Sequence, residues 1–188
     1  MRSLKKNLIL MSRTLFLSLL FVGVVSCQNL EPRRPINKQK QVFLKESAKR
    51  NKNIIAIEQT LFRQAIQQEE KLSFESTSQG FWYAYQKKTP SDASYPKKGD
   101  RVTFRYRIED LNKNLLYDEK ELGEVSFFVD QEDLIPALRE GVKYLRLGEI
   151  GVFLFPSYLC YGYQGDGEKI GINQPLRFTI ELLNLEKK

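Results

Sequence analysis

Histidine is absent from this chain of 188 residues, and cysteine, methionine and tryptophan are scarce. Without histidine, an imidazole-dependent catalytic triad and a histidine-ligated zinc site are both excluded. The two cysteines, Cys27 and Cys160, are too few for a disulfide scaffold. The chain also lacks a basic stripe with interleaved aromatic residues, so we expect no nucleic-acid binding.

Residues 1–26 have the pattern of a secretion signal, with a basic start and an apolar run from Leu15 to Val25. The run is too short for a comfortable membrane span. It ends in Val-Val-Ser-Cys at 24–27, which resembles a bacterial lipobox, so Cys27 is predicted to be lipidated. The alternatives are an ordinary signal peptide and an uncleaved anchor. The basic residues of this segment supply more than half of the net charge of +7, which is therefore partly a targeting feature.

Two further segments precede the body of the protein. Residues 27–40 are polar and contain two prolines, which predicts a flexible tether after Cys27. Residues 41–73 are predicted to form an amphipathic helical segment, because 41–71 contain neither glycine nor proline. Its expected apolar stripe consists of Ile54, Ile57, Leu61 and Ala65, broadened by Phe62 and Ile66. This stripe is expected to pack either on the chain's own body or on a second copy, which would make a homodimer through 41–71.

Residues 74–188 read as a domain of short strands with one helix. Strict alternation in 102–108 places Tyr106 on the core face of its strand. Pro136 suits the first position of a short helix, because a missing N–H costs nothing there. Two strands near the C-terminus flank a glycine-hinged loop with three tyrosines, which is how one wall of an apolar pocket is built. We predict an α+β fold, an antiparallel sheet of about five or six strands curled around one short helix.

Seven motifs, in this order and spacing, resemble the FKBP-type peptidyl-prolyl cis/trans isomerases over about 81–185. They are K-K-G-D-R-V-T-F-R-Y (97–106), Y-D (117–118), L-I-P-A-L-R-E-G-V (134–142), L-G-E (147–149), F-P-S-Y-L-C-Y-G (155–162), I-G-I-N (170–173) and L-R-F-T-I-E-L-L (176–183). The lipobox, the E-P-R-R-P tether (31–35) and Q-G-F-W-Y (79–83) are more narrowly similar to lipoprotein isomerases of gliding motility.

The resemblance implies a set of site residues. The catalytic residues would be Tyr106, Asp118 and Tyr161. The residues that bind substrate would be Tyr117, Val125, Leu134, Ile135, Leu138, Ile170 and Phe178. Asp118 is expected to accept a hydrogen bond from Tyr106, while the Tyr161 hydroxyl and the Ile135 N–H would hold substrate carbonyls. Two positions depart from the family: Val125 replaces an aromatic residue, and Leu138 replaces a tryptophan. Cys160 has no base beside it and is interpreted as a structural thiol.

Such a pocket suits the rotation of an X–Pro bond, which is slow because rotation breaks amide resonance. The twisted transition state is less polar than the planar amide, so a dry apolar pocket favours it, and no metal or cofactor is needed. We therefore predict an isomerase of X–Pro segments in envelope proteins, lipid-anchored at the outer membrane and facing the periplasm. The alternatives are a catalytically weak binding module or chaperone, and a structural role through the helix at 41–71.

Overall fold

The computed structural model describes residues 38–89 and 93–188. The predicted signal segment, Cys27 and most of the tether lie outside these ranges, so the predictions for them stay predictions. The chain divides into two compact units, Met1–Val42 and Phe43–Lys188, and the second holds every predicted site residue except Cys27. Within the described ranges, no helix is both long and apolar enough to cross a membrane.

An antiparallel sheet of seven strands forms the body, which confirms the predicted fold class. In chain order the strands are β1 (Glu75–Ser76), β2 (Trp82–Lys87), β3 (Arg101–Glu109), β4 (Leu115–Tyr117), β5 (Glu124–Phe128), β6 (Ile150–Phe155) and β7 (Leu176–Glu186). The short strand β1 extends the sheet beyond the predicted strands by pairing with β2. On one edge β3 pairs with β7, and on the other it pairs with β5 near its start and β4 near its end.

The core face of the sheet follows from the alternation of apolar residues in β3 and β7. In β3, Val102, Phe104, Tyr106 and Ile108 are buried, and in β7, Leu176, Phe178, Ile180 and Leu182 are buried. The predicted inward direction of Tyr106 is therefore confirmed. The two strands align Tyr106 opposite Ile180 and Ile108 opposite Phe178. This register brings the aromatic residues of both strands to the same part of the core.

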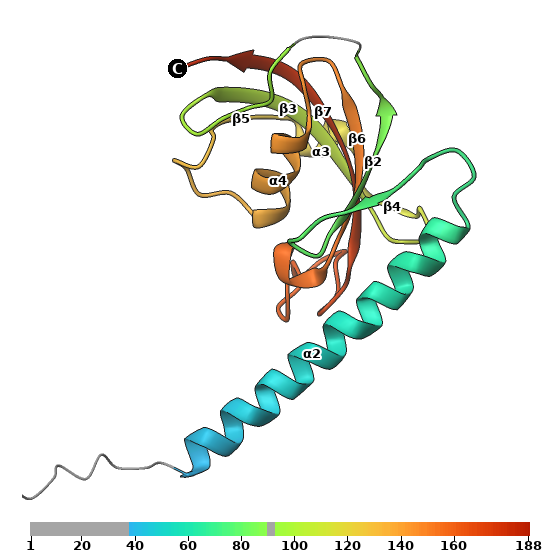
Figure 1. Cartoon of the computed structure of the whole chain (residues 1–188), viewed down its shortest axis with the longest axis vertical. Coiled ribbons are helices and arrows are strands. Elements are labelled where there is room, and N and C mark those ends of the chain that lie inside the picture. The colour runs from blue at the N-terminus through green and yellow to red at the C-terminus, as the bar shows by residue number, and fades with distance from the viewer. Residues whose placement is uncertain (1–37, 90–92) are drawn as a thin grey trace, which may run out of the picture. The chain divides into compact units, whose positions relative to one another are not determined.

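A short helix, α4 (Pro136–Gly141), lies within the curve of the sheet and continues into the 3-10 turn η1 (Val142–Tyr144) (Figure 1). It begins at Pro136, as the sequence predicts. Its apolar side chains join the same hydrophobic core as the strands. Gly141 permits the close approach, because a Cβ there would lie 3.0 Å from Ile180 Cδ1 and 3.1 Å from Phe155 Cζ.

The long helix α2 (Lys38–Gln67) forms as one continuous element, and its packing face matches the predicted stripe only in part. Phe62 is fully buried and Glu58 is 2% exposed, whereas Ile57 is 60% exposed and Leu61 is 38% exposed. The packing face keeps Phe62 and the half-buried Ile54, Ala65 and Ile66 of the predicted stripe, and it adds Glu58. Ile57 and Leu61 therefore do not pack on the chain's own body, where Glu58 takes a place on the contact face, and their packing on a second copy stays a prediction.

Polar contacts fix the C-terminal half of α2 to the body. The Gln59 side chain donates to the Gly80 carbonyl at 2.7 Å and accepts from Trp82 Nε1 at 3.0 Å. Beyond the helix, Glu69 pairs with Lys113 at 2.9 Å and with Arg177 at 3.4 Å. These contacts join α2 and the residues after it to the start of β2, to the turn between β3 and β4, and to β7. The N-terminal half of the helix carries exposed apolar side chains instead.

Candidate active site

The predicted apolar and aromatic site residues come together in one hydrophobic cluster. The cluster includes Tyr106, Tyr117, Val125, Leu134, Ile135, Leu138, Tyr161, Ile170 and Phe178. They come from four strands, from α4 and the segment before it, and from the long loop between β6 and β7. Tyr106 and Phe178, for example, are 72 positions apart in the chain and lie in contact in the fold.

Tyr106 and Phe178 form the floor of the site. Their rings stack with centroids 6.0 Å apart and planes 7° apart. Phe155 meets Phe178 edge-on, with centroids 5.5 Å apart. Phe178 is fully buried and Tyr106 is 8% exposed, so this floor is held by packing on both strands. Burial raises the pKa of Tyr106, and its phenol therefore stays neutral in ordinary buffers.

Tyr161 supplies a free hydroxyl. It follows the 3-10 turn η2 (Ser157–Leu159) in the loop after β6 and is partly buried. Burial, reinforced by the neighbouring Tyr106, raises the pKa of its phenol to about 12. Among the described residues, its hydroxyl has no hydrogen-bond partner, so it is available to a substrate carbonyl.

Ile135 supplies a free backbone donor at the start of α4. Its carbonyl accepts the N–H groups of Leu138 at 3.1 Å and Arg139 at 3.2 Å, which makes it the N-cap residue of the helix. Its own N–H donates to no group in the described part of the chain. Helix starts leave such donors unsatisfied, and Pro136 has none to offer. The site therefore presents two donors beside an apolar floor.

Asp118 takes a different position from the one predicted. It is exposed and caps the one-turn helix α3 (Glu119–Leu122), where its Oδ1 accepts the N–H of Lys120 at 2.9 Å and of Glu121 at 2.7 Å. No hydrogen bond joins it to Tyr106 within the described ranges, so that part of the prediction is not supported. A catalytic role for Asp118 stays a prediction.

A hydrogen bond between Tyr117 and Asp166, which we call the clasp, lies at one side of the site. The sequence did not predict it. Tyr117 Oη donates to Asp166 Oδ2 at 2.5 Å. This hydrogen bond raises the pKa of Tyr117 to about 12. Nearby, Lys169 Nζ lies 2.7 Å from Glu121 Oε1 and 4.3 Å from the centre of the Tyr117 ring. The sequence signal for this contact was Tyr117 itself, since a partly buried phenol needs a hydrogen-bond partner.

The loop that carries Ile170 is shaped by Asp166 and Gly165. Asp166 Oδ1 accepts the N–H of Glu168 at 2.9 Å and of Ile170 at 2.8 Å. Burial by itself raises the pKa of Asp166, but the hydrogen bonds from Tyr117 and these backbone groups outweigh it and lower the pKa. Gly165 has a φ of +68°, and a Cβ there would collide with the Ile170 carbonyl oxygen. The clasp therefore holds a loop that only glycine allows to close.

The half-buried thiol of Cys160 and the buried carboxylate of Glu58 do not form a nucleophilic or metal site. Burial, and then the charge of Glu58, raise the pKa of the Cys160 thiol well above its usual value. Burial likewise raises the pKa of Glu58, although the Ser157 N–H hydrogen-bonds to both its oxygens at 3.3 Å. A protonated thiol is a poor nucleophile, which agrees with the structural interpretation of Cys160. Across 38–89 and 93–188, no cluster of acidic or cysteine side chains could hold a metal ion.

An aromatic floor, aliphatic walls and two free donors define a site of the prolyl isomerase class, because such a site stabilises a twisted amide without covalent chemistry. A model of the FKBP-type peptidyl-prolyl cis-trans isomerase family matches residues 92–183. FK506-binding protein 1 of Yarrowia lipolytica is 35% identical over 99 residues, which cover 51% of this chain and 91% of that protein. The chain belongs to the FKBP-type peptidyl-prolyl cis-trans isomerase family.

Larger bacterial relatives and solved structures are also similar to this chain. The probable isomerase FkpA of Neisseria meningitidis is 34% identical over 112 residues, which cover 58% of this chain but only 39% of that relative. FkpA from Escherichia coli has the same fold, with a TM-score of 0.55 and 22% identity over 97% of this chain and 82% of that structure. An isomerase from Pseudomonas syringae also has a TM-score of 0.55, at 21% identity, over 72% of this chain and 96% of its own.

Proposed function

We propose that this protein catalyses cis–trans isomerisation of X–Pro bonds in polypeptides that fold in the bacterial cell envelope. The observation that carries the proposal is the convergence of the stacked Tyr106–Phe178 floor with the free donors of Tyr161 and Ile135. Proline-limited refolding of a model protein should accelerate when catalytic amounts of the protein are added. No acceleration at stoichiometric protein would refute catalysis.

The geometry suggests how the bond is twisted. The proline ring lies on the Tyr106–Phe178 floor, and Leu138 and Ile170 wall it. The Tyr161 hydroxyl and the Ile135 N–H hold the carbonyls of the substrate on either side, so the chain is fixed while the amide rotates. As the C–N bond twists, it loses resonance and charge separation, and the apolar surroundings favour this state over the planar amide. Each 1.36 kcal/mol by which the site stabilises the twisted amide more than the planar amide gives about a tenfold increase in rate.

We further propose that Asp118 contributes electrostatically. Its Oδ1 is occupied by the backbone of α3, while its Oδ2 accepts no hydrogen bond from the described residues. That oxygen can face the nitrogen of the twisting amide, which becomes more basic as resonance is lost. Asp118→Asn keeps the shape of the side chain and lowers kcat if the charge matters, whereas an unchanged kcat would leave Asp118 as a helix cap alone.

The lipobox at 24–27 supports a place of action at the outer membrane, facing the periplasm, with Cys27 as the lipid anchor. Each buried methylene of a lipid chain contributes about 0.8 kcal/mol, so several chains hold a protein firmly. The narrower resemblance to lipoprotein isomerases of gliding motility suggests that motility proteins are among the clients. In the producing bacterium, Cys27→Ala should move the protein from the outer-membrane fraction to the soluble periplasmic fraction. An unchanged distribution would argue against lipidation.

A homodimer through 41–71 is a separate part of this proposal. Phe43 and Leu44 of α2 are mostly exposed, and the described part of the chain does not cover them. Large exposed apolar side chains gathered on one element indicate a partner surface. Replacing both residues by serine should halve the mass measured by light scattering. If the wild-type protein is already a monomer, this dimer does not exist.

A second candidate function is that of a binding module or chaperone with little turnover. Val125 and Leu138 favour it, because they replace two aromatic walls of the family's pocket. This candidate predicts that Asp118→Ala abolishes catalysis but preserves the role of the protein in the cell. Loss of both would count for the isomerase.

A further inference from the structure

A cavity of about 580 Å³ lies between α2 and the loop after β6, apart from the residues of the Tyr106–Phe178 floor. Its apolar lining comes from Ile54 and Ile55 of α2 and from Tyr158 and Tyr163 of the loop. The amide side chains of Asn51 and Gln164 add hydrogen-bonding groups. None of the described residues that line it carries a charge. The volume is in the range of ordinary ligand sites, about 300–1,000 Å³.

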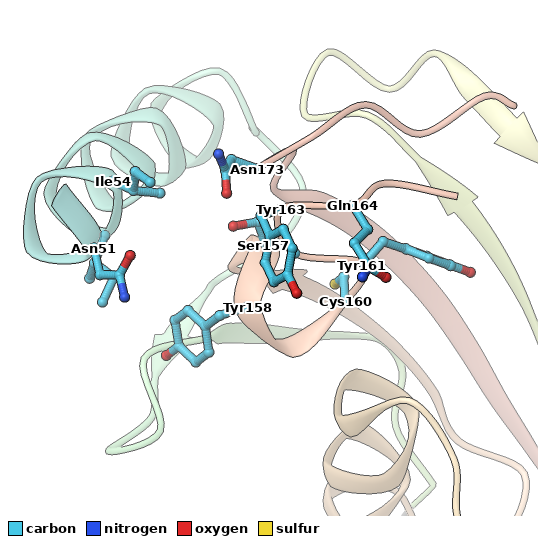
Figure 2. Close-up of a pocket in the computed structure, with 11 residues that line it drawn as sticks. Asn51, Ile54, Ser157, Tyr158, Cys160, Tyr161, Tyr163, Gln164 and Asn173 are labelled. Atoms are coloured by element: carbon cyan, nitrogen blue, oxygen red, sulfur yellow. The ribbon is translucent and has the colours of Figure 1, made fainter. Parts of the chain in front are cut away.

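This groove adjoins the isomerase site across one loop. Tyr161 belongs both to the groove lining and to the cluster that forms the prolyl site. In Figure 2 the phenol of Tyr161 points away from Asn51 and Ile54 of α2, while its loop borders the groove. A polypeptide held on Tyr161 therefore needs only to cross this loop to reach the groove.

The groove is held in place on both sides. The Ser157 N–H binds the buried carboxylate of Glu58, which lies one helical turn after Ile54. On the loop side, Tyr158 Oη donates to the Gln79 carbonyl at 2.7 Å. A groove that is already formed does not have to be ordered when its ligand binds, so more of the contact energy appears as affinity.

We propose that this groove binds an extended segment of the same polypeptide whose X–Pro bond occupies the prolyl site. The residues that line the groove indicate what kind of ligand it binds. Apolar and aromatic side chains receive the apolar residues that a folded client would bury, and amides can pair with any backbone. Since no charged residue lines the groove, it selects for unfolded chain rather than for one sequence. Tyr163 and Ile55, which are 76% and 41% exposed, would be covered by such a segment. This inference rests on the proposed isomerase function.

The test compares two isoleucines of α2. Ile55 lines the groove, whereas Ile57 is exposed outside it, so Ile55→Arg and Ile57→Arg add the same charge to the same helix. Three quantities are measured: isomerisation of a tetrapeptide with one X–Pro bond, catalysis of proline-limited refolding, and the Kd of a fluorescein-labelled, permanently unfolded polypeptide. A tetrapeptide fills only the prolyl site, while the two long chains also reach the groove.

We expect Ile55→Arg to weaken the Kd about tenfold or more and to raise KM in refolding similarly, because a buried apolar contact is replaced by a charge. Tetrapeptide kcat/KM should stay within about twofold of wild type. Ile57→Arg should change none of the three. Tyr163→Ser, at a mostly exposed position that the fold does not require, should reproduce the effect of Ile55→Arg.

Two results would overturn the proposal. One is an equal Kd for Ile55→Arg, Ile57→Arg and wild type. The other is a wild-type dimer that Ile55→Arg dissociates without any change in Kd, which would assign the groove to a second copy. Failure of the isomerase function looks different: tetrapeptide isomerisation would be absent in wild type, while Ile55→Arg still weakened binding of the unfolded chain, and the groove would stand.

Discussion

The packing of α2 on the body can be tested at two adjacent residues. Phe62 is fully buried, so Phe62→Ala removes a whole ring from the interface between helix and domain. Such truncations reduce the free energy of unfolding by about 3–5 kcal/mol. Leu61 is partly exposed, and Leu61→Ala should cost at most about 1 kcal/mol. The sequence alone places both residues on the apolar stripe, so the ratio of the two losses measures which face packs.

The single tryptophan provides the assay. Trp82 Nε1 donates to Gln59 Oε1 of α2 at 3.0 Å, so its fluorescence reports whether the helix is docked. Urea unfolding is followed by this fluorescence and by far-UV circular dichroism. We predict that the two signals change together and that Phe62→Ala moves the midpoint much further than Leu61→Ala. Equal shifts, or loss of helix signal before any change at Trp82, would refute the packing described above.

Three further predictions concern the site. Tyr161→Phe removes one hydrogen-bond donor worth about 0.5–1.5 kcal/mol, so kcat/KM should fall by up to roughly tenfold. Because burial raises the pKa of Tyr161 to about 12, the wild-type rate should be independent of pH up to about pH 10. A change in rate with pH below that value would contradict this role of the hydroxyl. Tyr117→Phe removes the hydrogen bond to Asp166. Because the pKa of Asp166 is lowered in the folded protein, its charged form stabilises the fold above the ordinary aspartate pKa of 3.8, and this stabilisation is lost as the pH falls through the folded pKa. The urea midpoint of the variant should therefore lie below that of wild type at pH 7 and converge with it in acid, whereas a difference that persists in acid would exclude linkage through Asp166. Cys160→Ala should leave kcat/KM within about twofold of wild type in the tetrapeptide assay, and a large loss would make the thiol more than structural.

Sequence reasoning predicted the sheet well because its strands bury one face. In β3 and β7 the alternation of apolar residues alone fixes which side chains point inward, including Tyr106 and Phe178. Pro136 likewise marks the start of α4, because proline is favoured there and poorly tolerated inside a helix. The inward faces of β3 and β7 and the start of α4 are set by local sequence pattern, and tertiary contacts do not change them.

The buried position of Glu58 on α2 could not be predicted, because it depends on a contact far along the chain. Glu58 turns inward to meet the Ser157 N–H, 99 residues away, and a buried glutamate gives no sign in an apolar periodicity. The clasp of Tyr117 and Asp166 joins residues 49 positions apart and was missed for the same reason. The cap at Asp118 was readable, since an aspartate followed three residues later by Glu121 is a helix-start pattern.

The central claim is that the pocket on Tyr106 and Phe178 rotates X–Pro bonds, and exchange NMR on a tetrapeptide tests it most directly. Uncatalysed exchange between the cis and trans forms takes about tens to hundreds of seconds. With substoichiometric protein, we predict exchange cross-peaks between the two forms at mixing times well below a second. A spectrum at equimolar protein that shows no more exchange than the free peptide would contradict the claim.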